Sequence, residues 1–303
     1  MIANTRMLVA FLVLVLVAGC ADPGPPVPET ETPATKLLIG LVPEHNVFRQ
    51  IERYEPLTDY LSTATGMEIT LDILPRYGDT VDRLVSAGVD GAFLGSFAYA
   101  LAHSRSNMTV VARPVDLEGA STYHGLVFVS ESSGISNVEQ MRGKRFVFVD
   151  QATTAGYLLP LDLFSRHGIL EPTAFLGEAY FAGTHEGAIQ DVVEGRADIG
   201  AAKSTVFERL AEEDERIAKK LVILERSPEV PENALALRRD LDASVKDRLK
   251  QALLAMHLDP KGQEALRSLG EQRFIETTED DYAPVFRYAD EIGIDLQTYR
   301  YDE

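Results

Sequence analysis

The stretch LVSAGVDGAFLG at residues 84–95 and the stretch VVEGRADIGAAK at residues 192–203 share one pattern. Each passes from an apolar helical segment through small residues and an aspartate, Asp90 or Asp198, into a strand of small residues. Helix–Gly–strand junctions recur in any α/β chain, so the similarity alone leaves open both chance and a repeated unit. A repeated unit would give two similar lobes with a ligand cleft between them.

Strand and helix patterns alternate along the rest of the chain, which favours an α/β fold. Apolar β-branched runs such as KLLIGLV at residues 36–42 predict the strands. We expect one lobe to contain residues 36–124 plus 233–303, including the C-terminal helices, and the other to contain residues 125–232. Two segments of the chain would then cross between the lobes.

Helical periodicity predicts which faces are buried. Val81, Leu84 and Val85 fall on one face of a predicted helix. The segment YEPLTDYLSTATG at residues 54–66 predicts another helix, with Pro56 in its first turn, where proline is tolerated.

The N-terminus has the features of an export signal. MIANTRMLVAFLVLVLVAGC combines one basic residue, an apolar run and small residues before Cys20. VAGC resembles a bacterial lipobox, so we expect a signal peptide over 1–19 and a lipid on Cys20; a signal-anchor helix is the alternative. Residues 20–35 hold five prolines and predict an extended tether. The folded part would then lie in the cell envelope, facing the periplasm or the extracellular space.

Composition excludes several classes of function. The formal net charge of −18 argues against nucleic acid and anionic lipid as electrostatic partners. A single cysteine leaves no internal disulfide and no cysteine-based metal site. The sequence has no GxSxG, P-loop or HExxH motif, and its six histidines lack metal-ligand spacing. We therefore expect no enzyme activity, metal or cofactor.

The motif DQATTAGY at residues 150–157 lies between a predicted strand and a predicted helix. Its threonines have two interpretations. They would cap the helix, because small hydroxyl residues are preferred there. They would also suit an anion, because a helix N-terminus presents free N–H groups and a positive dipole end.

Four segments together resemble the phosphonate, phosphite and phosphate-binding proteins of ABC importers: RYEPLTDYLS, DGAFLGSFAYALAH, DQATTAGYLLP and FAGTHEGAIQDVVEGRADIGAA. The resemblance extends from about residue 37 to 285. It implies a two-lobed type II periplasmic binding protein that captures a small phosphorus oxyanion, namely phosphate, phosphite or an alkylphosphonate, and delivers it to permease subunits. A ligand sensor for a membrane kinase is the alternative role, and a hydrolase on a similar scaffold is less favoured.

The resemblance also implies an anion site. Thr153 and Thr154 match a Ser-Thr pair that binds phosphoryl oxygens. Ala155 stands where a third hydroxyl residue is common, so only its backbone N–H would remain. Tyr77 and Tyr123 match tyrosines that line the pocket, although either would also suit a core position.

Four further residues complete the predicted site. Ser96 either caps a helix or faces the cleft. His185 matches a histidine beside the anion, as a charged or a neutral donor, although Thr184 would cap the same helix without it. Lys203 and Asn233 stand where aminophosphonate-binding relatives hold the ligand ammonium with carboxylates. Without those carboxylates, Lys203 would pair with an oxyanion and disfavour an ammonium, unless it is a solvated surface lysine.

Overall fold

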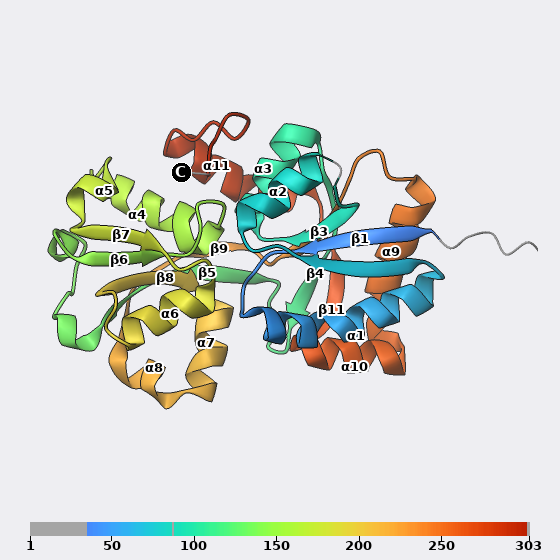
Figure 1. Ribbon diagram of the computed structural model, residues 1–303, viewed down its shortest axis with the longest axis horizontal. Coiled ribbons are helices and arrows are strands. Elements are labelled where there is room, and N and C mark those ends of the chain that lie inside the picture. Colours follow the sequence, from blue (N-terminus) through green and yellow to red (C-terminus); the bar gives the residue numbers. More distant parts are fainter. Residues whose placement is uncertain (1–34, 87, 302–303) are drawn as a thin grey trace, which may run out of the picture. The chain divides into compact units, whose positions relative to one another are not determined.

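The computed structural model describes residues 35–86 and 88–301. Within these ranges the chain forms two mixed β-sheets flanked by helices, which are the two lobes of the expected α/β fold (Figure 1). The predicted signal peptide, Cys20 and all but the last residue of the predicted tether lie outside the described residues. In the described part, no helix combines the length and apolar composition that a bilayer span requires.

The first sheet has the strand order β11-β4-β10-β3-β1-β2. Parallel strands β2 and β3 flank β1, whereas β10 runs antiparallel to β3 and β4. The bounds are β1 Lys36–Leu41, β2 Glu68–Ile73, β3 Gly91–Leu94, β4 Thr109–Asp116, β10 Ala234–Leu237 and β11 Glu271–Glu276.

Helices bury both faces of this sheet. On one face, α1, α9 and α10 pack a core that includes Leu57, Leu253 and Leu266. On the other face, α2, α3 and α11 contribute to a second core with Val81, Phe97 and Val285. The bounds are α1 Val47–Thr65, α2 Tyr77–Val85, α3 Ser96–Ser106, α9 Ala243–Ala255, α10 Pro260–Leu269 and α11 Ala283–Glu291.

Two helix predictions are wrong in detail. Helix α1 begins at Val47, because the Asn46 side chain caps it by accepting the Arg49 N–H at 3.1 Å. Pro56 therefore lies inside the helix rather than in its first turn. On α2, Val85 is 40% exposed, because the helix ends there and its last residue points away from the core.

The second sheet has the strand order β7-β6-β8-β5-β9. Its strand β5 begins at Thr122, so residues 122–124, expected in the first lobe, pair with β9 instead. The strands are β5 Thr122–Ser130, β6 Arg145–Phe148, β7 Glu178–Phe181, β8 Ile199–Lys203 and β9 Leu221–Pro231. The helices are α4 Leu159–Arg166, α5 Pro172–Phe175, α6 His185–Val193, α7 Ser204–Glu213 and α8 Glu215–Lys220.

The C-terminal segment contacts both lobes. Helix α11 packs against α3 of the first lobe and α4 of the second (Figure 1). Beyond it, the Tyr299 hydroxyl donates to the Gln151 carbonyl at 3.1 Å. The lobes are therefore joined by this segment as well as by the two crossings after β4 and after β9.

The similarity between residues 84–95 and 192–203 reflects a repeated unit. In the first lobe, the Leu38 N–H donates to Asp90 Oδ2 at 2.9 Å, and the Asp90 N–H donates to the Leu38 carbonyl at 2.8 Å. In the second, the Arg145 N–H donates to Asp198 Oδ2, and the Asp198 N–H donates to the Arg145 carbonyl, both at 3.0 Å. Each aspartate thus fixes the neighbouring parallel strand, β1 or β6, at its first residues.

We expect Asp90→Ala to lower the free energy of unfolding by about 1–3 kcal/mol, because the partly buried Leu38 N–H loses its acceptor. Asp240→Ala is the matched control, since the Asp240 side chain is 74% exposed; it should change stability by less than about 0.5 kcal/mol. Urea denaturation measures both. Equal effects of the two substitutions would refute the role of Asp90.

Candidate ligand-binding site

Two helix starts, one from each lobe, meet between the lobes. In the first lobe, β3 leads through Gly95 into α3, which begins at Ser96. In the second, β6 leads into a π-helical turn, Thr154–Leu158, that continues as α4. The Thr154 hydroxyl oxygen accepts the Phe97 N–H at 2.8 Å. The positive dipole ends of both helical segments therefore lie close together.

The turn before the second helix start explains the small residues of DQATTAGY. The Thr153 hydroxyl donates to the Asp150 carbonyl at 2.6 Å, so it closes the turn. Gly156 has no room for a side chain, because a Cβ there would lie 2.3 Å from Val149 Cβ. The Thr153 side chain makes no capping bond, so its hydroxyl closes the turn instead of capping the helix as one of the two interpretations expected.

Ser96 and Ala155 are buried at these junctions. The Ser96 hydroxyl donates to the Pro231 carbonyl at 2.6 Å, so it fastens α3 to the second crossing and makes no capping bond. Ala155 is 1% exposed and packs near Gly125 of β5. Their backbones shape the junction, but neither side chain offers a free donor.

Tyr77 and Tyr123 are both 3% exposed. Among the described residues, the Tyr77 hydroxyl has no hydrogen-bond partner although it is buried. Burial raises the pKa of Tyr77 well above its usual value, so the hydroxyl keeps its proton. Burial also raises the pKa of Tyr123, to about 12. An unpaired buried hydroxyl is costly, and a ligand acceptor would satisfy it.

His185 begins α6 and its ring meets the Tyr77 ring edge-on, with centroids 6.2 Å apart. Its Nδ1 accepts the Lys203 N–H at 3.2 Å, so the ring proton lies on Nε2. Burial lowers the pKa of His185 to about 3. In the unliganded protein His185 is therefore neutral, and its Nε2–H remains as a donor. Thr184 does cap the helix, accepting the Gly187 N–H at 2.9 Å.

Lys203, at the end of β8, is 4% exposed and is not a solvated surface lysine. Its Nζ lies 2.5 Å from Glu232 Oε2, 3.0 Å from Glu44 Oε1 and 3.4 Å from Asn233 Oδ1. It also lies 4.7 Å from the centre of the Tyr123 ring. Burial alone would lower the pKa of Lys203, but attraction to Glu232 and Glu44 raises it above its ordinary value.

The expectation that carboxylates are missing here is wrong. Glu232 stands one residue before Asn233, in the PEN segment, and its side chain reaches Lys203. Glu44 comes from the loop after β1, where no pattern in the sequence indicated a site residue. Burial would raise the pKa of Glu44, but the charge and hydrogen bond of Lys203, together with the nearby His45 and His185, outweigh burial and bring it down to about 2. Lys203 is thus already paired and is not an open oxyanion receptor.

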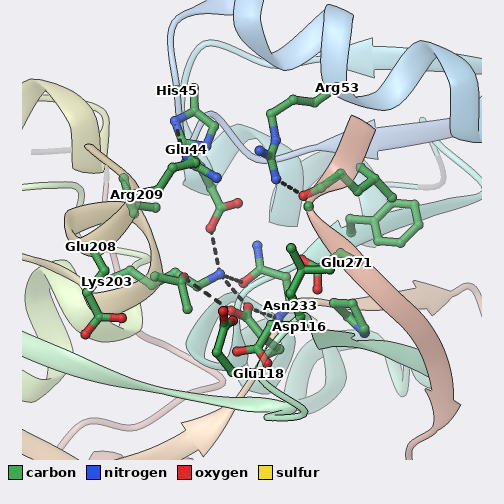
Figure 2. A pocket seen from close by; sticks show the side chains of 18 of the residues that line it. Glu44, His45, Arg53, Asp116, Glu118, Lys203, Glu208, Arg209, Asn233 and Glu271 are labelled. Carbon is green, nitrogen blue, oxygen red and sulfur yellow. Dashed lines mark hydrogen bonds and ion pairs between the residues drawn. The ribbon is translucent and has the colours of Figure 1, made fainter. Parts of the chain in front are cut away.

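A cavity of about 530 Å³ adjoins Lys203 and Asn233 (Figure 2). Its walls combine apolar side chains, such as Phe93, Leu117 and Phe274, with many polar ones: Glu44, His45, Arg53, Asp116, Glu118, Lys203, Glu208, Arg209, Glu212, Glu232, Asn233 and Glu271. Burial raises the pKa of Glu271 to about 8, so this carboxyl group is largely neutral at pH 7. Over residues 35–86 and 88–301, no cluster of three His, Cys, Asp or Glu residues is arranged for a metal ion.

The nine predicted site residues form one connected, buried group. Contacts link Tyr77 to His185, His185 to Lys203, and Lys203 to Tyr123 and Asn233. Gly95, which precedes α3, lies beside both Asn233 and Thr154: a Cβ built on it would be 3.4 Å from Asn233 Oδ1 and 4.0 Å from Thr154 Oγ1. The two helix starts therefore adjoin this group. The sequence analysis missed Glu44, Glu232 and the cavity that adjoins Lys203 and Asn233.

Curated relatives cover most of the chain. The phosphate-import protein PhnD of Mycolicibacterium smegmatis is 26% identical over 253 residues, which is 80% of this chain and 78% of that protein. The phosphonates-binding periplasmic protein of Escherichia coli is 22% identical over 78% of this chain and 71% of its own length.

Solved structures share the fold. A binding component of an ABC phosphonate transporter from Pseudomonas aeruginosa matches with a TM-score of 0.78 and 22% identity over 84% of this chain and 85% of its own. PhnD1 from Prochlorococcus marinus, solved in complex with methylphosphonate, matches with a TM-score of 0.76 and 20% identity over 85% and 98%. Residues 39–282 match the family of phosphonate-binding periplasmic proteins of ABC transporters. Because this match spans most of the chain and both lobes, the protein belongs to that family of substrate-binding proteins.

Proposed function

We propose that this protein captures a small phosphorus oxyanion, namely phosphate, phosphite or a short alkylphosphonate, and passes it to the permease subunits of an ABC importer. Its family consists of binding proteins rather than catalysts. Relatives are named for phosphate import, phosphonate binding and phosphite binding, which supports this ligand class.

The observation that carries the proposal is the buried Tyr77 hydroxyl, which lacks a partner among the described residues. Beside it, neutral His185 holds its ring proton on Nε2, and two helix starts lie within the same connected group. The Thr154 oxygen accepts the Phe97 N–H, and its own proton, which lies within hydrogen-bond reach of the Tyr123 hydroxyl, would be donated to the oxyanion instead. A set of donors suits a tetrahedral oxyanion, which brings only acceptors when fully ionised.

The net charge of −18 does not contradict an anionic ligand. Net charge governs long-range attraction and solubility, whereas a buried site acts through nearby groups. Here the nearby donors are neutral hydroxyl, imidazole and backbone N–H groups, which retain their protons at pH 7. Binding would therefore depend on hydrogen bonds made out of contact with water.

We expect phosphate, phosphite or methylphosphonate to raise the melting temperature, because a ligand that binds only the folded state stabilises it. Differential scanning fluorimetry followed by calorimetry measures the effect. If no phosphorus oxyanion binds with a dissociation constant below about 1 mM, the proposed ligand class is wrong.

Tyr77→Phe tests whether the oxyanion binds at the Tyr77 hydroxyl. The substitution should leave the unliganded protein as stable or more stable, since it removes an unpaired buried hydroxyl. It should weaken oxyanion binding roughly tenfold or more, as expected for a lost hydrogen bond to a charged group. Unchanged affinity would place the anion elsewhere.

The neighbouring threonines provide a matched pair. We expect Thr154→Val to reduce oxyanion affinity by about 1.5–3 kcal/mol, because a donor to a charged ligand is lost. Thr153→Val should instead lower the free energy of unfolding by about 0.5–1.5 kcal/mol with little effect on affinity, because its hydroxyl closes the turn to Asp150. Calorimetry and urea denaturation on both variants separate the two roles. The reverse assignment of effects would show that Thr153 is the ligand donor.

We also propose that Cys20 carries a lipid and begins the mature chain, which would hold the protein at the cell envelope. The support is the VAGC segment at the end of an apolar run. Cys20→Ala should yield a protein that is uncleaved or released from the membrane fraction, because no acyl chain is attached. Fractionation and mass spectrometry check this. A cleaved Ala variant that stays in the membrane fraction would disprove the anchor.

A further inference from the structure

The surroundings of Lys203 form a complete receptor for a primary ammonium group. Two carboxylates, Glu232 and Glu44, and the amide oxygen of Asn233 lie within 2.5–3.4 Å of Nζ. The Tyr123 ring closes the remaining side at 4.7 Å as a cation–π contact. Three oxygen acceptors match the three N–H donors of an ammonium group.

This receptor is buried and assembled from distant parts of the chain. The side chains of Lys203, Glu232 and Glu44 are 5%, 9% and 12% exposed. Glu44 comes from the loop after β1, Glu232 and Asn233 from the second crossing, and Tyr123 from β5. By contrast, the ion pair of Lys36 with Glu68 is largely solvated, at 75% and 52% exposure. An exposed pair of that kind contributes little, whereas a buried charge requires its partners.

The receptor also adjoins the proposed anion site. The Asn233 oxygen lies 3.4 Å from Lys203 Nζ and 3.4 Å from a Cβ built on Gly95, the residue that precedes the start of α3. Lys203, Glu44, Glu232 and Asn233 also line the cavity (Figure 2). A ligand whose phosphoryl group met the helix starts would therefore direct its substituent towards the Lys203 ammonium.

We propose that Lys203 determines specificity by occupying, with the chain's own ammonium group, the place that a ligand ammonium would otherwise take. The inference rests on the proposed function, because it assumes an oxyanion at the helix starts. Two ammonium groups cannot share these acceptors, since the second would be buried without partners beside a like charge. The wild-type site thus accepts an alkyl substituent and rejects an aminoalkyl one.

Removal of the lysine side chain should open the receptor. In Lys203→Ala, n-propylammonium supplies the missing three carbons and the nitrogen, and we expect it to raise the melting temperature by several degrees more than NaCl does. The same salt should not raise that of the wild type or of Lys203→Met, whose side chain still fills the space. This readout requires no phosphorus ligand, so it tests the receptor independently of the proposed function.

Calorimetry with ethylphosphonate and 2-aminoethylphosphonate, which differ by one ammonium group, tests specificity. Wild type should prefer ethylphosphonate at least tenfold, and Lys203→Ala should reverse the preference. Lys36→Ala is the control and should behave like wild type, because its ammonium is on the surface. A wild type that prefers the aminophosphonate would overturn the proposal.

Glu44 and Glu232 would repel each other in Lys203→Ala, so the double variant Lys203→Ala with Glu232→Gln provides a second background. This variant retains one carboxylate, and propylammonium should stabilise it in melting or refolding experiments as it stabilises Lys203→Ala. If neither variant responds to propylammonium, or neither folds even in its presence, the receptor does not exist as proposed. If propylammonium stabilises the variants but no phosphonate binds, the receptor stands and the proposed function fails.

Discussion

The buried ammonium of Lys203 constrains the arrangement of both lobes. A charge at 4% exposure needs its partners in place, and here they come from outside its own lobe: Lys203 ends β8 of the second lobe, whereas Glu44 belongs to the first lobe and Glu232 to the second crossing. If the lobes moved apart at Glu44, Lys203 would lose one of its two carboxylates. The ion pair therefore couples the relative position of the lobes to the chemistry of the site.

Several other polar contacts join the lobes, and they differ in burial. Arg49 pairs with Glu213 at 2.8 Å, but both side chains are at least one third exposed, and such pairs contribute little. The Phe97 N–H bond to Thr154 is buried, but it joins neutral groups that a ligand would engage. Buried His45 of the first lobe also lies 3.6 Å from Glu186 and 2.6 Å from Arg209 Nη2 of the second lobe, so the contacts between the lobes include, but are not confined to, the residues assigned to binding. Conformation and ligand occupancy are thus expected to depend on each other.

The sequence predicted the fold because its signals are local. The junctions at Asp90 and Asp198 each combine a helix end, a small residue and a strand within twelve residues, and both aspartates hold a neighbouring strand as the repeat suggested. The family resemblance located nine residues that do lie together. Glu44 was missed because it lies 159 positions from Lys203 and no local pattern marks it. The predicted start of the helix near Pro56 was wrong, because Asn46 caps the helix and it begins at Val47.

The distribution of charge explains how one acidic chain would hold both the proposed anion site and the ammonium receptor. At the helix starts the donors are neutral, and burial keeps His185 and Tyr77 in their neutral forms. Lys203, whose N–H donates to His185, forms a group of net charge −1 with Glu44 and Glu232. Asn233 is the side chain that connects this group to the helix starts. The ammonium offsets one of the two carboxylate charges near the proposed anion site, so its removal would leave two buried negative charges there.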